Sequence, residues 1–219
     1  MDNAAYTAET AFSVKQILAG GTYTTRKFTT TGVAALVAGT VMGAVLAAAS
    51  ATVTVGTPVS GVGGTVGNGT ISAFTCDDGA QEGVWNLICT VTGATGKFKV
   101  VRPDGTIDGV LTIGTAYTGG INGTVSDGAN DWLVDDIIPV TVAYDWAALE
   151  YKKARAAATD GSQTPRAILA QDVDVTSADK EAIYYETGQI VGSALTLGAG
   201  HTVATIREGL RRLGLVIDD

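Results

Sequence analysis

The stretch GVAALVAGTVMGAVLAAASA, residues 32–51, runs for twenty positions without a charged side chain. An apolar run of about 18 residues or more is long enough to be a candidate membrane helix. Its composition argues against insertion, because eight of the residues are Ala and three are Gly, which gain little in hydrocarbon. Gly39 and Gly43 form a GxxxG pair, but each glycine would cost a helix about 1 kcal/mol relative to Ala. We therefore predict a β-strand within GTVMG (39–43), more strand in TVTV (52–55), and no membrane span.

The composition of the whole chain favours a mainly β fold. Its 219 residues include 29 Gly, only 4 Pro and 6% aromatic residues, which suits strands joined by tight turns. Only 16% of residues are charged, so disorder through charge repulsion is not expected. The net charge of −8 excludes nucleic acid as an expected partner. The opening MDNAAYTAETAFSVKQ has no basic-then-apolar order, so we expect no signal peptide.

Residues 52–145 are a series of short β-rich runs. Turn signals such as PDG (103–105) and DG (127–128) separate them, and side chains alternate in KFKVV (97–101) and PVTVAY (139–144). This pattern predicts an antiparallel, Ig-like β-sandwich of about seven strands. The segment carries ten acidic and three basic residues, a net charge of −7, which leaves −1 for the rest of the chain. We therefore expect two separate units.

The flanking segments predict further strands and one helix. Residues 17–32 indicate short extended pieces, and a strand is expected around Tyr151 and again at 167–170, after the turn TDGSQTP (159–165). EAIYYETGQIVGSALTL (181–197) predicts another strand. Thr202 is a plausible N-cap for a short amphipathic helix that ends before Gly214 and places these residues at helical spacing: Val203, Ile206, Leu210 and Leu213.

The residues that could take part in catalysis or bind a metal do not form a recognisable motif. If DDGAQEG (77–83) is a hairpin turn, Cys76 lies opposite the region of Trp85 and too far from Cys89 for a disulfide. We therefore expect two free, apolar cysteines in a reducing compartment. His201 has no nucleophile pattern near it. We predict no catalytic residues, no metal site, no cofactor and no enzymatic activity.

Two ligand-binding interpretations stay open, each beside a purely structural one. The acidic run SDGANDWLVDD (126–136) offers oxygen ligands for Ca²⁺, although solvated turn residues are the expected outcome. Four aromatic residues could build a sugar-binding platform, although core packing is expected for them: Trp85, Tyr117, Trp132 and Trp146. The alternative function is accordingly an Ig-like adhesion or glycan-binding module.

The flanking segments together resemble a known family. LAGGTYTTRKFTTTG (18–32), LVAGTVMGAV (36–45), YKKARAAATDGSQTPRAILAQDVD (151–174) and ETGQIVGSALTL (186–197) are similar to the lambda-like head decoration proteins of tailed phages. ATDGSQTPRAILAQDVD (158–174) is the most specific of these motifs. The resemblance covers residues 15–51 and 146–219. Residues 52–145 depart from it and are similar to an Ig-like module common in phage structural proteins, inserted at a loop tip.

The resemblance implies both an architecture and a function. The architecture is a flexible N-terminal arm (1–16), a discontinuous β-rich decoration domain with a short C-terminal helix (17–51 and 146–219), and an inserted Ig-like β-sandwich (52–145). The function is that of a homotrimer that binds the major capsid protein on the outer surface of the expanded shell at three-fold sites and stabilises it. The protein would be made in the host cytoplasm and reside in the virion, with no nucleic-acid or membrane partner. A host-surface glycan is a further candidate partner of the inserted segment.

The N-terminal arm is the predicted capsid-binding element. An arm of this kind can add a strand to an edge of the capsid protein, where main-chain hydrogen bonds supply the affinity. The residues expected to contact the capsid are Tyr6, Phe12, Val14, Ile17 and Leu18.

Overall fold

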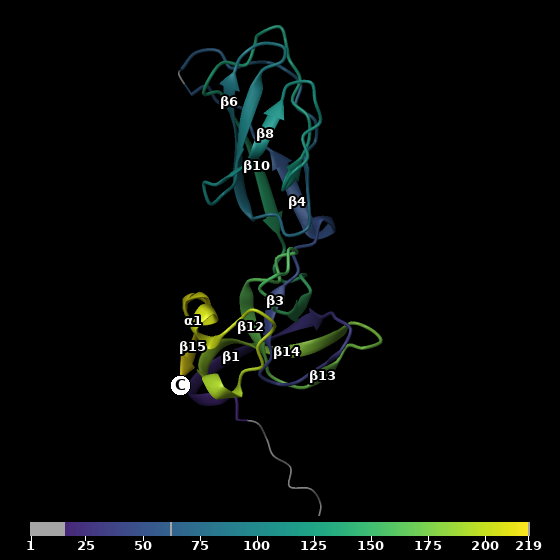
Figure 1. Ribbon diagram of the computed structural model, residues 1–219, viewed down its shortest axis with the longest axis vertical. Helices are drawn as coiled ribbons and strands as arrows, with labels where there is room; N and C mark the ends of the chain where they lie inside the picture. The colour runs from purple at the N-terminus through teal and green to yellow at the C-terminus, as the bar shows by residue number, and fades with distance from the viewer. Residues whose placement is uncertain (1–15, 62, 219) are drawn as a thin grey trace, which may run out of the picture.

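The chain forms two lobes stacked end to end, so that the molecule is elongated (Figure 1). The structure is a computed structural model that describes residues 16–61 and 63–218. The upper lobe comprises residues 51–144, and the lower lobe comprises residues 16–44 and 151–218. No strand of one lobe pairs with a strand of the other. The predicted mainly β fold is confirmed, whereas independent folding of the central segment stays a prediction.

The lower lobe is built on a sheet that closes on itself. Its strand order is β1-β11-β3-β12-β14-β15, and a further pairing of β1 with β14 completes a ring of five strands. A short ladder of two strands, β2 and β13, lies beside this barrel. The strands are β1 (Leu18–Thr30), β2 (Ala35–Leu36), β3 (Val41–Ala44), β11 (Tyr151–Lys153), β12 (Pro165–Leu169), β13 (Val173–Asp174), β14 (Lys180–Val191) and β15 (Leu215–Asp218).

The uncharged stretch 32–51 supplies a central strand of the barrel. It contains β2, β3, the 3₁₀ turn η1 (Ala48–Ser50) and the first residue of the next strand, so the predicted strand is confirmed. All four residues of β3 are buried. A Cβ at Gly43 would lie 2.2 Å from the carbonyl oxygen of Ser162, which explains why so small a residue is needed there. No helix in the described part of the chain is long and apolar enough to cross a membrane.

One helix covers part of the barrel. The helix α1 (Val203–Arg212) begins at Thr202, whose side chain accepts from the backbone N–H of Thr205 in a capping box. Ile206 and Leu210 face inward and pack in a cluster with Ile168, Ile190, Leu215 and Ile217. The predicted cap and helix are therefore confirmed. The chain then reverses at Gly214, with φ of 93°, and adds β15 parallel to β14.

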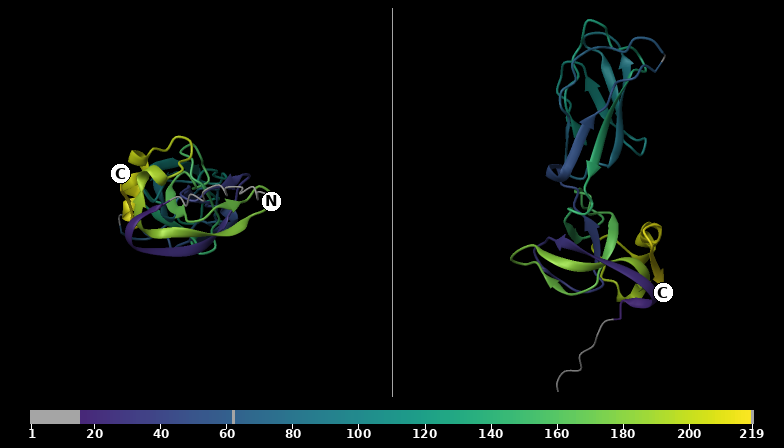
Figure 2. Two further views of the ribbon diagram at one scale, coloured as in Figure 1. Left: turned by 90° about the horizontal axis from the view of Figure 1, so that it is seen from below. Right: turned by 180° about the vertical axis from the view of Figure 1, so that it is seen from behind.

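The upper lobe has the number of strands that the sequence predicts. A five-stranded antiparallel sheet has the order β4-β10-β6-β7-β8, and β5 pairs separately with β9. These strands are β4 (Ala51–Val55), β5 (Thr75–Cys76), β6 (Gly83–Val91), β7 (Lys97–Val101), β8 (Ile107–Thr112), β9 (Ile121–Asn122) and β10 (Ile137–Tyr144). Long loops of the upper lobe cover one face of its five-stranded sheet (Figure 2). The Ig-like assignment itself stays a prediction.

The environment of the cysteines differs from the expected hairpin. Cys76 pairs with Ile121 and not with the region of Trp85, so the hairpin prediction is wrong. The loop after Cys76 turns at Asp77–Ala80 beside the lower lobe, where Gly79 N–H donates to Leu46 O, but β5 pairs with β9 and not with β6. Both cysteines are nevertheless free and buried, as predicted.

Candidate functional site

The described chain begins at the lower end of the molecule, opposite the upper lobe (Figure 1). Of the five predicted capsid-binding residues, Tyr6, Phe12 and Val14 lie outside the described residues. Ile17 is buried in the cluster beneath α1, and its carbonyl oxygen accepts the N–H of Val191 at 2.8 Å. Leu18 is half-buried and starts β1. The Ile17 side chain therefore supports the fold, and its contact with a capsid stays a prediction.

A cleft of about 370 Å³ lies between β1, β14 and β15, near the point where the described chain begins. None of its lining residues is charged: Gly21, Thr22, Thr187, Gly188, Gln189, Gly214 and Val216. Gly188 has φ of 141° within β14, and Gly214 has φ of 93° at the turn between α1 and β15. The sequence analysis did not find this cleft, and its glycines are the only local signal for it.

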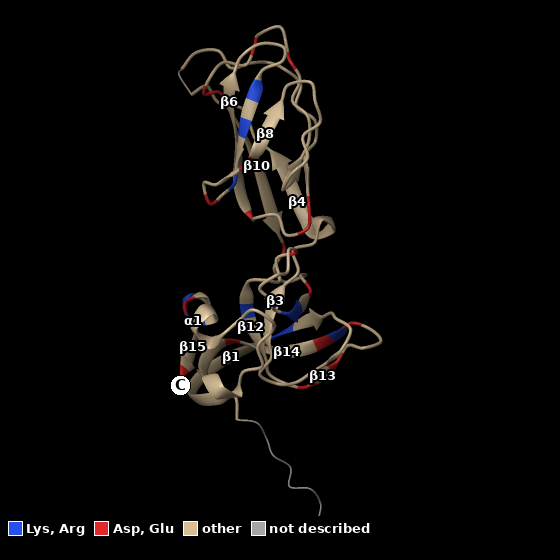
Figure 3. Ribbon diagram, in the orientation of Figure 1, with Lys and Arg blue, Asp and Glu red and all other residues tan. Residues whose placement is uncertain are grey.

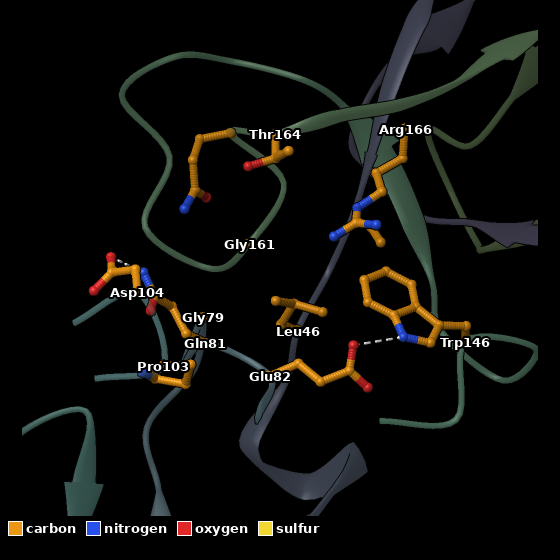
Figure 4. Close-up of a pocket in the computed structure, with 12 residues that line it drawn as sticks. Leu46, Gly79, Gln81, Glu82, Pro103, Asp104, Trp146, Gly161, Thr164 and Arg166 are labelled. Atoms are coloured by element: carbon orange, nitrogen blue, oxygen red, sulfur yellow. Dashed lines mark hydrogen bonds between the residues drawn. The ribbon is translucent and has the colours of Figure 1, made fainter. Parts of the chain in front are cut away.

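A second cleft of about 440 Å³ lies where the two lobes meet (Figure 4). Trp146 lines one side of this cleft, where its indole N–H donates to Glu82 at 2.9 Å and Arg166 stacks on its ring at 4.0 Å. Glu82 belongs to the upper lobe and Arg166 to the lower lobe. Trp146 therefore connects the two lobes.

Backbone hydrogen bonds strengthen this junction. Leu46 accepts from Gly79 N–H and donates its own N–H to Asp160 O, both at 2.7 Å. The N–H of Ala48 donates to the carboxylate of Asp78 at 2.7 Å. A Cβ at Gly79 would lie 2.0 Å from the carbonyl oxygen of Thr159, so the upper-lobe loop approaches the lower lobe closely. The junction is thus a packed interface.

Two carboxylates at the junction are held in their charged forms. Hydrogen bonds from Gln81 and then from Thr106 lower the pKa of Asp104 from 3.8 to about 2. Burial raises the pKa of Asp160, but hydrogen bonds from Lys152 and Ser162 outweigh it, so that pKa lies below its usual value. Both groups are ionised at neutral pH, which suits ion pairing and not proton transfer.

The charged residues of the upper lobe are unevenly distributed (Figure 3). Its acidic residues lie mostly in loops at its two ends, whereas Lys97 and Lys99 lie on β7, next to the edge strand β8. Arg102, the third basic residue, pairs with the buried side chain of Asp108. The strongly acidic character of the segment therefore resides in its ends.

The possible sugar platform is not present on the surface. Trp85 and Trp132 are each 1% exposed and Tyr117 is 8% exposed, so core packing is confirmed for these three. Only Trp146 is partly accessible. Among the described residues, no group of three or more His, Cys, Asp or Glu side chains is arranged to hold a metal ion. His201 lies just before α1, away from both cysteines in the fold.

Comparison with known proteins identifies the class. The chain matches the family model described as bacteriophage lambda head decoration protein D over residues 8–216. It therefore belongs to the lambda head decoration protein D family. Members of this family are structural proteins of the phage head, so this chain is a capsid decoration protein and a component of the virion.

Other comparisons add little. No curated protein sequence matches this chain. The crystal structure of Xanthomonas campestris FlgL is similar at 14% identity and a TM-score of 0.31, covering 48% of this chain and 32% of that one. The chain thus spans about a third of the length of that protein, and the likeness supports no statement about fold or function.

Proposed function

We propose that this decoration protein binds the outer surface of the expanded phage shell as a homotrimer at three-fold sites and stabilises the shell. The family match over nearly the whole chain is the observation that carries the proposal. The fold is compatible with it, because the described chain begins at one end of the molecule and the acidic lobe stands at the other (Figure 1). The protein would be made in the host cytoplasm and then join the virion.

Residues 1–16 are the proposed contact with the major capsid protein. Tyr6, Phe12 and Val14 would accompany a strand that this arm adds to a capsid edge. Ile17 and Leu18 would anchor the arm, since Ile17 is buried and Leu18 opens β1. The lower lobe would supply the contacts between subunits of the trimer, because its part of the chain is nearly neutral and repels a second copy little.

Residues 52–145 would fold as an inserted unit that projects away from the shell. Their net charge of −7 would keep neighbouring copies apart at short range. A glycan-binding role for this unit is not favoured, because three of the four aromatic candidates are buried in its core.

Electron microscopy of expanded, DNA-free shells mixed with the purified protein tests the proposal directly. We expect three-lobed density on the outer surface at the three-fold positions, and shells that rupture at a higher temperature. Unexpanded shells are the control and should bind less. Bare expanded shells after mixing, or density at other positions, would refute the proposed binding mode.

A further inference from the structure

Strand β1 has one edge that, before Thr30, no other strand of the described residues covers. It pairs with β14 along its length on one side, but on the other side it meets β11 only at Thr30. Ala170 N–H donates to Ile183 O at 2.8 Å, so the main chain of Ile183 faces β12 and not β1. Lys27 lies opposite Ile183, and its main-chain groups therefore point away from β14.

Main-chain groups alternate in direction along a strand, so those of Thr25, two residues before Lys27, point to the same side as those of Lys27. Thr25 and Lys27 both present an N–H and a C=O group to the uncovered edge, and both residues are exposed. No hydrogen bond links these main-chain groups to any other described residue. Such an open edge is a template for an added strand unless it is blocked. The register of β1 against β14 shifts between Thr24 and Thr25, where Glu186 of β14 is the extra residue, and the pairing is regular from Thr25 to Thr30.

A pocket of about 180 Å³ lies beside this edge. Strand β11 begins only at Tyr151 and the preceding residues 146–148 form a turn, so β1 has no strand partner on this side at Phe28. Aromatic rings of Phe28, Trp146 and Tyr151 line it. A side chain from a strand added to β1 would have this pocket as its nearest cavity.

The charges around the pocket select the kind of side chain. Arg26 and Arg166 line it together with a single carboxylate, that of Glu186. Arg26 lies 3.6 Å from Glu186, and Arg166 stacks on Trp146 at 4.0 Å with no carboxylate of its own among the described residues. Two guanidinium groups against one carboxylate favour an acidic side chain.

We propose that the free edge of β1 and the Arg26–Arg166 pocket together accept an extended segment of the shell protein that carries an acidic side chain. The inference rests on the proposed function, which brings the shell to this chain. Strand β1 continues directly from residues 1–17, so a shell strand that pairs with the arm would run on along this edge. Main-chain hydrogen bonds would supply affinity, and the pocket would supply specificity.

A matched pair of substitutions at one position tests the edge. Thr25→Pro removes an outward N–H that the fold does not use, whereas Thr25→Val keeps that N–H. We expect Thr25→Pro to weaken binding to expanded shells about tenfold or more, and Thr25→Val to change it less than about twofold. Arg26→Gln should also weaken binding, and Arg26→Lys should restore most of it. Equal melting temperatures would confirm that all four variants fold.

The outcomes separate the site from the function on which it rests. If the wild-type protein fails to bind expanded shells, both proposals fall. If it binds and Thr25→Pro binds equally well, only the edge site is overturned. Hydrogen exchange adds a second readout, since the Thr25 and Lys27 amides should be protected only on shells. Protection in the free protein that disappears when residues 1–15 are removed would assign the edge to the chain's own arm and refute the shell segment.

Discussion

Ala51 and Tyr144 face each other as the last residue pair of the β4–β10 ladder, so the central segment enters and leaves the upper lobe at adjacent positions. Residues paired across an antiparallel ladder have Cα atoms only about 5 Å apart. A short connection can therefore replace everything between them.

The first prediction is that joining residue 51 to residue 146 through a short Gly/Ser link leaves a soluble protein that binds shells. One hydrophobic cluster runs through both lobes and includes Met42, Tyr144 and Tyr151, so the deletion exposes apolar surface. We expect a lower melting temperature than that of the full chain, measured by circular dichroism. An insoluble or non-binding product would argue against an inserted unit.

The second prediction separates the arm from the fold. Removing residues 1–16 should abolish shell binding in a co-sedimentation assay and leave the melting temperature unchanged. Ile17→Ala should instead lower the melting temperature, because Ile17 is only 5% exposed and its truncation costs about 2–5 kcal/mol of unfolding free energy. Full shell binding by the truncated protein would contradict the arm mechanism.

The third prediction concerns the junction. Trp146→Ala removes both the hydrogen bond to Glu82 and the stacking with Arg166, and should lower the unfolding free energy by about 1–3 kcal/mol. It should also broaden the distribution of lobe orientations seen by small-angle X-ray scattering. Trp146→Phe keeps the ring and serves as the control, with an intermediate effect. An unchanged scattering profile for Trp146→Ala would show that the backbone contacts alone hold the lobes.

A fourth prediction concerns Asp136, whose side chain is buried and accepts from Gly67 N–H at 3.1 Å and Leu133 N–H at 3.0 Å. Asp136→Ala leaves these donors without an acceptor and should cost about 2–5 kcal/mol in a denaturant titration. Asp136→Asn keeps an acceptor oxygen and should cost less. The exposed neighbour Asp131 is the control, since Asp131→Ala should change stability by less than about 0.5 kcal/mol.

The fifth prediction is a pH dependence. Burial raises the pKa of Asp108, but hydrogen bonds from Tyr117 and Arg102 outweigh it, so the folded-state pKa lies below 3.8. A depressed pKa gives stability that is present above the unfolded-state value and is lost as pH falls through the folded-state value. The stability difference between the wild-type protein and Asp108→Asn should therefore be constant from pH 7 to about 5 and shrink below about pH 4. A difference that grows on acidification would contradict this.

Sequence reasoning found the elements whose signals are local. Thr202 caps its helix, and β3 lies largely within GTVMG and includes Gly43, because capping and backbone preferences depend on adjacent residues. It did not find β15 or the long pairing of β1 with β14. In the case of β1, the partners lie 150 or more residues away along the chain.

The candidate site was harder to predict than the fold. The placement of Cys76 opposite Ile121 and the pocket beside Phe28 both depend on which strands pair and which do not. Residue patterns record what a strand prefers, but not which of its edges another strand will cover. The free edge of β1 could therefore be seen only in the folded protein.

The long ladder between β1 and β14 also has a mechanical consequence. A load applied at residue 16 pulls along the axis of β1, whereas the hydrogen bonds of an antiparallel ladder lie perpendicular to the strands. The ladder is thus loaded in shear, and its bonds share the force instead of opening one after another as in a zipper. If the arm holds the shell as proposed, its load would therefore reach the lower lobe through a ladder that resists it.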